Sequence, residues 1–320
     1  MDDADLLAYR DLADALIRMG RHTEAIPFYR KLVEASPDEE SLLLALAWAL
    51  YDSGNPKEAA PCFERLFQRE LARKLVTGFA YDELVRIYRA GKNWDGLISV
   101  CGRAVAAQPE DVGLLKTLGD AYLAADRAGD AVKVFETLTA LEPDAPENWC
   151  ALGNARLAAA DPGAAENAYC RAAEIVPADA SAFFSRLAGA LLRAGHSEKA
   201  QAAIDRCLAL TPDEPLYLMD LGDVLIRRGK PDAAADAYAR AASLNPAAAG
   251  GAWYRLGTLL TKEGLHLPAT EAFAEAVAAE PGNTRYLLGL AASYATQGLT
   301  DLAGETLRRM ESGNGRVDQQ

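Results

Sequence analysis

The chain has 320 residues, half of them hydrophobic and a quarter charged, so it has the composition of a folded protein and the length for several domains or an elongated array. Its 46 acidic and 33 basic residues give a formal net charge of −13, which argues against nucleic acids and anionic membranes as partners. No apolar run reaches the roughly 18 residues of a membrane span, and the acidic start MDDADLLAYRD is unlike a secretory signal, so we expect a cytoplasmic protein without membrane insertion.

A pattern of 34 residues recurs along the chain with small slips. The typical repeat has an aromatic residue or Leu at position 4, Leu at 7, a small residue at 8, a large residue at 11, Ala at 20, an aromatic at 24 and Pro at 32, and single repeats depart from it, as at Leu71 in place of Pro. The repeats start near residues 6, 40, 78, 112, 146, 181, 215, 250 and 284. Positions 4, 7, 8 and 11 share one helical face, as do 20, 24 and 27. Each repeat therefore predicts two amphipathic helices joined by a short turn, with small residues allowing the two helices to approach closely.

This frame resembles the tetratricopeptide repeat family, whose pattern W-x2-L-G-x2-Y…A-x3-F…P matches repeat by repeat. The fifth repeat matches best, with Trp149, Leu152, Gly153, Ala165, Tyr169 and Pro177. The resemblance implies an all-α fold, a right-handed superhelical solenoid of antiparallel helix pairs over residues 1–311. It also implies that the first helices line a concave surface, through positions 2, 5, 6, 9, 12 and 13, where extended peptides bind.

The second and third repeats place large apolar residues at these inward positions, namely Leu44, Trp48, Tyr51 and Phe79. Rigid aromatic side chains of this size are typical of binding hot spots, so we expect them to contact a partner. The alternative is that the lengthened second helix, or the first repeat, covers them.

The second repeat is four residues too long, which predicts a second helix extended through FERLFQRELARKL. Along it Arg65, Arg69 and Arg73 are spaced i, i+4, i+8 and form a basic ridge. The ridge either pairs with neighbouring carboxylates or docks an acidic partner.

Further along the chain the inward positions become charged and polar. They include Lys116, Asp120, Asn154, Arg186, Asp223, Tyr254 and Arg255. The clamp with which some family members capture a chaperone's terminal carboxylate is incomplete, because Asp120 stands where it needs Asn and Cys150 where it needs Lys. What is left predicts a mixed-charge groove for an extended segment of a protein.

No constellation for catalysis, metal binding or a cofactor is present. His22, His196 and His266 each lie in the turn of a different repeat, so they are not expected to converge. The five cysteines lack CxxC spacing and are expected to be reduced and mostly buried. We therefore expect no enzyme activity.

The last repeat needs Leu302 and Leu307 inside it and still leaves an apolar edge uncovered, before a polar tail at 312–320 that we expect to be disordered. Either the chain is a piece of a longer protein or a second copy covers the edge as a homo-oligomer.

These features predict a non-catalytic scaffold for protein–protein interactions, and the abundance of Ala and Arg hints at a bacterial source. Two alternatives stay open at this point. One is a recruiting or regulatory segment of a larger enzyme such as a glycosyltransferase, and the other is a structural protein that assembles end to end. The sequence does not indicate the identity of the partner.

Overall fold

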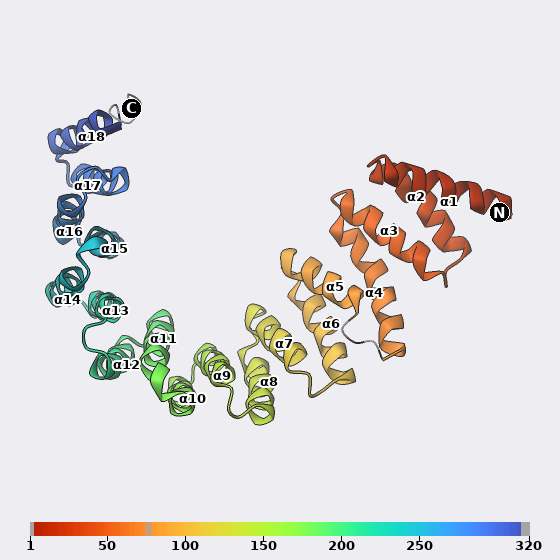
Figure 1. Cartoon of the computed structure of the whole chain (residues 1–320), viewed down its shortest axis with the longest axis horizontal. Coiled ribbons are helices and arrows are strands. Elements are labelled where there is room, and N and C mark those ends of the chain that lie inside the picture. The colour runs from red at the N-terminus through yellow and green to blue at the C-terminus, as the bar shows by residue number, and fades with distance from the viewer. Residues whose placement is uncertain (1–2, 75, 77, 315–320) are drawn as a thin grey trace. The chain divides into compact units, whose positions relative to one another are not determined.

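The computed structural model describes residues 3–74, 76 and 78–314, and within these ranges the chain is helical with no strand. The chain divides into two compact blocks, an N-terminal block, Met1–Pro143, and a C-terminal block, Asp144–Gln320. Within each block, consecutive helices lie side by side in chain order and pack as antiparallel pairs (Figure 1). The predicted all-α fold of helix pairs is confirmed.

The N-terminal block holds four helix pairs. The first helices of its pairs are α1 (Asp3–Arg18), α3 (Glu40–Asp52), α5 (Phe79–Ala90) and α7 (Val112–Ala124). The second helices are α2 (His22–Ala35), α4 (Pro56–Ala72), α6 (Trp94–Ala107) and α8 (Ala128–Leu141). Within this block α2, α4 and α6 also pack on the first helix of the following pair, so neighbouring pairs share one hydrophobic core.

The C-terminal block holds five further pairs. Its first helices are α9 (Pro146–Ala158), α11 (Ala180–Arg193), α13 (Pro215–Arg227), α15 (Ala249–Lys262) and α17 (Thr284–Thr296). Its second helices are α10 (Pro162–Ile175), α12 (Ser197–Leu210), α14 (Pro231–Leu244), α16 (His266–Ala279) and α18 (Thr300–Asn314). Neighbouring first helices also contact one another along this block, from α9 to α17.

Local structure accounts for the slips in the repeat length. Short 3-10 helices, η1 (Pro177–Asp179) and η2 (Pro246–Ala248), stand before α11 and α15, where the sequence spacing is one residue longer than usual. The predicted extension of the second helix in the second repeat is also confirmed, because α4 has 17 residues whereas α2 has 14. The helix ends at Ala72, however, and Leu75 of the predicted stretch lies outside the described residues.

In four of the pairs an aromatic ring of the second helix packs directly against a glycine of the first helix. A Cβ added at Gly119 of α7 would lie 2.6 Å from the Phe135 ring of α8. The same close approach recurs where Gly153 meets Tyr169 and where Gly222 meets Tyr238. A methyl group fits nowhere in these contacts without moving a helix. The small residue predicted at position 8 therefore sets how closely the helices approach.

We predict that Gly119→Ala lowers the free energy of unfolding by about 1 to 3 kcal/mol, because the added methyl overpacks the contact with Phe135. Gly102, in the middle of α6, is the matched control, since nothing lies within 4 Å of a Cβ built there. Gly102→Ala should stabilise the helix by about 0.5 to 1 kcal/mol. Urea unfolding of both variants tests the prediction, and equal effects would contradict the role of the close approach.

All nine turns between paired helices in the described residues share one backbone geometry. Position 15 of each repeat has a positive φ, and it is Gly in six repeats but Lys92, Asp126 and Ala160 in the other three. The next backbone N–H donates to the carbonyl five residues earlier, as from Asp161 to Arg156 at 2.8 Å. Left-handed backbone costs a residue with a Cβ about 1 kcal/mol or more, which glycine avoids.

Ala160, with φ of 60°, offers a stabilising substitution. Ala160→Gly is expected to raise the free energy of unfolding by roughly 0.5 to 1 kcal/mol, because it relieves the left-handed strain. Ala158→Gly in the last turn of α9 has ordinary helical backbone and should instead lower stability by up to about 1 kcal/mol. Thermal denaturation compares the two, and a destabilised Ala160→Gly protein would be the contrary result.

The described part of the chain contains no helix whose length and hydrophobicity would suit a membrane span. Helix α18 reaches Asn314, so residues 312–314 of the predicted tail are helical. Residues 315–320 of that tail lie outside the described residues.

Candidate functional site

The first-helix face, meaning the surface formed by positions 2, 5, 6, 9, 12 and 13 of the first helices, is hollowed in the C-terminal block. Residues from α13, α15 and α17 together line a pocket of about 400 Å³. The three residues predicted to face inward here, Asp223, Tyr254 and Arg255, all line it. The inward positions of three consecutive repeats therefore meet at one site.

A network of hydrogen bonds and ion pairs connects two residues that line this pocket, Asp223 and Arg255, to neighbouring helices. Arg255 of α15 pairs with Asp223 and with Asp220, the latter at 3.0 Å, and both carboxylates come from α13. The hydroxyl of Tyr238 in α14 donates a hydrogen bond to Asp223, and the hydroxyl of Ser185 donates to Asp220 at 2.9 Å. Burial lowers the pKa of Arg255, but Tyr238 and Asp223 outweigh it and the net pKa is raised. Asp223 and Arg255 are thus engaged inside the chain and tie three helices together.

The bond from Tyr238 to Asp223 belongs to a recurring pair. A tyrosine at position 24 donates to the residue at position 9 of the same repeat, from Tyr29 to Asp14 at 2.6 Å and from Tyr169 to Asn154 at 2.8 Å. The predicted contact residue Asn154 is exposed, but its side-chain oxygen already accepts the hydrogen bond from Tyr169. The signal was present in the sequence, because Asp or Asn at position 9 accompanies Tyr at position 24 in all three repeats.

The fourth repeat lacks this pairing. Its position 24 is Phe135, which has no hydroxyl, and Lys116 and Asp120 are exposed one turn apart on α7. Arg186 of α11 is also exposed, but its guanidinium pairs with Glu147 at 3.0 Å and lies 5.9 Å from the ring centre of Phe183. Arg186 is therefore paired within the chain, whereas the exposed side chains of Lys116 and Asp120 are accessible to a ligand.

Tyr169 offers a measurable test of the pairing. Burial raises the pKa of Tyr169 to about 12, from an ordinary value near 10. The unfolded chain thus loses this proton at a lower pH than the folded chain. The stabilisation from Tyr169 is complete below pH 10, and about 2 to 3 kcal/mol should be lost as pH rises through 12.

Tyr169→Phe should remove that share of the alkaline loss and cost about 1 kcal/mol at neutral pH through the missing bond to Asn154. Urea unfolding of the two proteins at a series of pH values between 7 and 12 measures both effects. Parallel stability curves for the two proteins would contradict the assignment.

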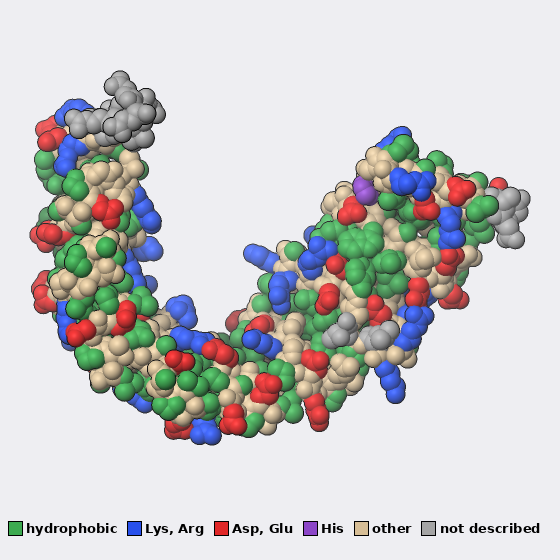
Figure 2. All heavy atoms as spheres, viewed as in Figure 1, with side chains coloured by type: hydrophobic (Ala, Val, Ile, Leu, Met, Phe, Trp, Pro, Cys, Tyr) green, Lys and Arg blue, Asp and Glu red, His purple; other side chains and the backbone are tan. Residues whose placement is uncertain are grey.

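The N-terminal block carries the aromatic cluster, which we define as Trp48, Tyr51, Phe63 and Phe79. The Trp48 ring lies 5.4 Å from Phe79, 5.8 Å from Tyr51 and 5.9 Å from Phe63 between ring centres. Phe63 is fully buried, Trp48 and Tyr51 are half-buried, and Phe79 is 42% exposed. Hydrophobic side chains accordingly gather over α3 in the space-filling view (Figure 2). Three of the predicted inward residues therefore form one surface patch anchored on a core ring.

Two neighbours complete the patch. Leu44 is half-buried and packs against the hydrophobic core, so it supports the cluster more than it extends it. The guanidinium of Arg86 in α5 lies 4.5 Å from the ring centre of Tyr51. Position 9 of the third repeat brings it there. Neither α4 nor the first repeat closes the patch, since Phe79 is open to solvent.

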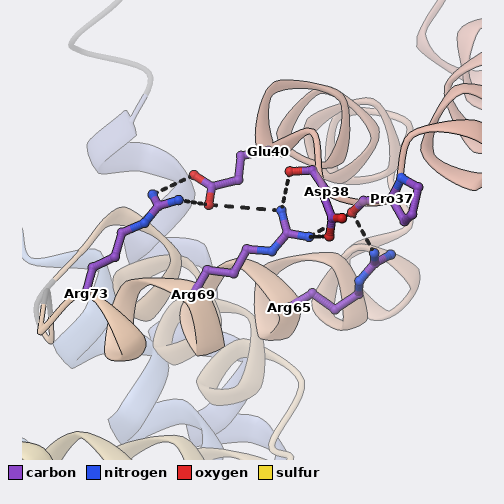
Figure 3. Close-up of polar contacts among 6 residues, drawn as sticks. All are labelled: Pro37, Asp38, Glu40, Arg65, Arg69 and Arg73. Carbon is purple, nitrogen blue, oxygen red and sulfur yellow. Dashed lines mark hydrogen bonds and ion pairs between the residues drawn. The ribbon is translucent and has the colours of Figure 1, made fainter.

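The basic ridge of Arg65, Arg69 and Arg73 points toward the loop between α2 and α3 (Figure 3). Arg65 donates to the carbonyl of Pro37 at 3.2 Å, and Arg69 donates to the same carbonyl at 2.7 Å. Arg73 forms two bonds to the carboxylate of Glu40, at 2.6 and 2.9 Å.

All three guanidinium groups of the ridge thus have partners within the N-terminal block. The ridge fastens α4 to the loop between α2 and α3 through the carbonyls of Pro37 and Asp38, and to α3 through Glu40. These contacts favour the alternative in which the ridge pairs within the chain, and docking of an acidic partner there stays a prediction.

No histidine or cysteine is among the lining residues of the pocket or the members of the aromatic cluster in the described residues. His22 and His266 begin α2 and α16, and His196 precedes α12. The five cysteines are free thiols, four of them buried and Cys170 half-buried. Within the described residues no group of His, Cys, Asp and Glu is arranged to hold a metal ion.

The last helix keeps an apolar edge. Leu302 and Leu307 of α18 are 42% and 39% exposed, whereas Leu287 and Leu290 of α17 are buried. The expectation that Leu302 and Leu307 lie inside the last repeat is therefore wrong, because no following helix pair covers α18 in the described residues. An apolar edge was expected here, and its covering by a second copy stays a prediction.

Family models match both parts of the chain. Residues 116–182, 185–252, 219–267 and 254–316 match the model described as Tetratricopeptide repeat, which covers more than half of the chain. Residues 1–90 match a different model, the Bacterial transcriptional activator domain. The expectation of a purely tetratricopeptide chain is therefore corrected for the N-terminal part, whose helix pairs have the same apolar spacing.

Comparison with individual proteins gives more distant likenesses. The human Protein O-mannosyl-transferase TMTC1 is 25% identical over 162 residues, which are 49% of this chain but only 18% of that protein. A crystal structure of MamA protein shares 21% identity with a TM-score of 0.41, over 53% of this chain and 92% of that one. The crystal structure of the APC/C hetero-tetramer Cut9-Hcn1 shares 17% identity with a TM-score of 0.39, over 95% of this chain and 52% of that one.

The family-model matches, the repeated Gly and aromatic contacts and the antiparallel pairs agree with one another. The chain belongs to the tetratricopeptide repeat family and carries at its N-terminus a region similar to the bacterial transcriptional activator domain.

Proposed function

We propose that this protein is a non-catalytic scaffold of bacterial transcriptional regulation, which holds a segment of a partner protein on its first-helix face. The match of residues 1–90 to the bacterial transcriptional activator domain supports the regulatory context. The tetratricopeptide repeats over 116–316 support binding of a protein.

The observation that carries the proposal is the aromatic cluster. It lies on α3, α4 and α5, inside the region that matches the activator domain. Phe79 is open to solvent and rests on Trp48, which rests in turn on the buried Phe63. A rigid, partly exposed aromatic group backed by the core offers a large contact area at a low cost in conformational entropy.

The chemistry of the buried groups supports a non-catalytic role. Burial raises the pKa of the Cys150 thiol to about 11 and that of Cys207 to about 12, so both stay neutral and weakly nucleophilic near pH 7. The buried tyrosines Tyr29, Tyr169 and Tyr238 each donate to a structural partner.

The net charge of −13 was the reason for excluding nucleic acids as partners, and the match to an activator domain does not support that exclusion. The proposal does not include a direct contact between this chain and DNA. The scaffold acts through its protein partner, because a strongly acidic chain repels a phosphate backbone wherever it lacks a basic stripe.

A recruiting segment of a larger enzyme is the alternative function, and the likeness to the human mannosyl-transferase is the observation that favours it. A reading frame that extends from this chain into a glycosyltransferase domain would decide for that alternative.

Affinity capture from the source bacterium tests the cluster. Phe79→Ala and Trp48→Ala should each reduce the recovered partner at least tenfold, as truncation of a hot-spot aromatic costs about 2 kcal/mol or more of binding. Phe79→Ala is the sharper variant, because that side chain is 42% exposed and its loss should change the melting temperature little.

Leu141→Ala is the matched control, since Leu141 is 38% exposed at the end of α8 and lies outside the cluster. Quantitative mass spectrometry of the captured proteins gives the recovery for each variant. Undiminished recovery with a correctly folded Phe79→Ala protein would refute the role of the cluster.

A further inference from the structure

The pocket on the C-terminal block continues into a second one. The pocket of about 400 Å³ and an adjoining pocket of about 260 Å³ share Tyr254, Thr258 and Lys262 of α15 as a common wall. Gly289 of α17 lines the second pocket, and a Cβ there would lie 3.0 Å from the rings of Phe273 and Tyr254. A side chain larger than glycine would fill this space, so the sequence keeps it open.

The first pocket is lined by three cations, Arg255, Lys262 and Arg285, and by one carboxylate, Asp223. Arg255 is matched by Asp220 and Asp223, as described above. Among the described residues, Lys262 and Arg285 have no carboxylate partner, and both side chains line the pocket. Lys and Arg side chains accordingly stand out along the edge of the C-terminal block at α15 (Figure 2). The site is cationic on a chain whose net charge is −13.

Aromatic rings hold one of these cations in place. The guanidinium of Arg285 lies 4.6 Å from the ring centre of Tyr254, and the Tyr254 and Tyr286 rings are 5.3 Å apart. Stacking on a ring fixes the plane of the guanidinium while its N–H edge stays open to a ligand. Arg285 is therefore preorganised for a carboxylate, which it can bind through two parallel hydrogen bonds.

We propose that this double pocket binds an acidic segment of a partner protein. Carboxylates of the segment pair with Lys262 and Arg285, and a neighbouring apolar side chain enters the second pocket against Tyr254 and Phe273. The proposal rests on the proposed scaffold function and names the chemistry of a partner for the C-terminal block. Charge complementarity selects this occupant, since cations in a pocket on an acidic chain attract an anionic segment to that pocket.

A peptide with a few carboxylates fits the site better than a nucleic acid does. The two cations without a carboxylate partner among the described side chains, Lys262 and Arg285, can neutralise two carboxylates. A nucleic-acid strand needs a longer basic track along its backbone. The adjoining apolar pocket, lined by Phe273, Gly289 and Ala292, suits an aliphatic side chain.

The test is selection of random octapeptides from a display library on the immobilised full-length chain. We expect the wild-type chain to enrich Asp and Glu together with an aliphatic residue. The double variant Lys262→Glu, Arg285→Glu should lower the recovery of the enriched peptides at least tenfold. The control, Lys199→Glu with Lys230→Glu, makes the same change of net charge at exposed sites on α12 and before α14, and should leave recovery unchanged.

Three results would overturn the proposal. They are the absence of acidic enrichment, equal recovery by the pocket variant, and equal loss in the control. A labelled single-stranded DNA oligonucleotide that binds the wild-type chain more tightly than the peptides, and fails to bind the pocket variant, would assign the site to a nucleic acid instead. Circular dichroism confirms that each variant is folded. Because the aromatic cluster is untouched in these variants, partner capture through Phe79 can succeed while this proposal fails, and the two outcomes are distinguishable.

Discussion

Six of the nine helix pairs carry an aromatic ring at position 24 of the second helix opposite a Gly or Ala at position 8 of the first, and this contact governs how those pairs pack. Where that residue is glycine, as at Gly119, Gly153 and Gly222, the ring lies closer than any Cβ would allow. The contact buries the ring and sets the distance between the helices. Because one side of each first helix packs into the core, the opposite side is left for the first-helix face. The 34-residue repeat places this side at the same positions in every pair, so the first-helix face follows from the packing of the core.

Residues on that face divide into two groups. Asp14, Asn154 and Asp223 accept hydrogen bonds from buried tyrosines, so their polar atoms serve the fold. The aromatic cluster, Lys116 and Asp120 in the N-terminal block and the cations Lys262 and Arg285 in the C-terminal block stay open to a ligand. A solvent-facing position on this surface is thus no guide to binding by itself. Its partner on the second helix decides whether the side chain is available to a ligand.

Much of this could be predicted from the sequence, because the spacing of apolar residues reflects helix faces directly. The frame, the small residue at position 8 and the longer α4 followed from it. The partners of Arg65 and Arg69 could not be predicted, since they are backbone carbonyls that any loop residue offers. The open pocket depends on the absence of a side chain at Gly289, which has meaning only once Tyr254 and Phe273 surround it. The activator-domain region was not foreseen, because its helices follow the same apolar spacing as the repeats.

Hydrogen–deuterium exchange of the chain with and without its captured partner tests the central claim, that the first-helix face binds while the second helices serve the core. The account predicts slower exchange of the backbone amides of α3 and α5, or of α15 and α17, when the partner is bound. The exchange of α4, α14 and α16 should change little. Protection confined to second helices, with α3, α5, α15 and α17 unchanged, would contradict the account.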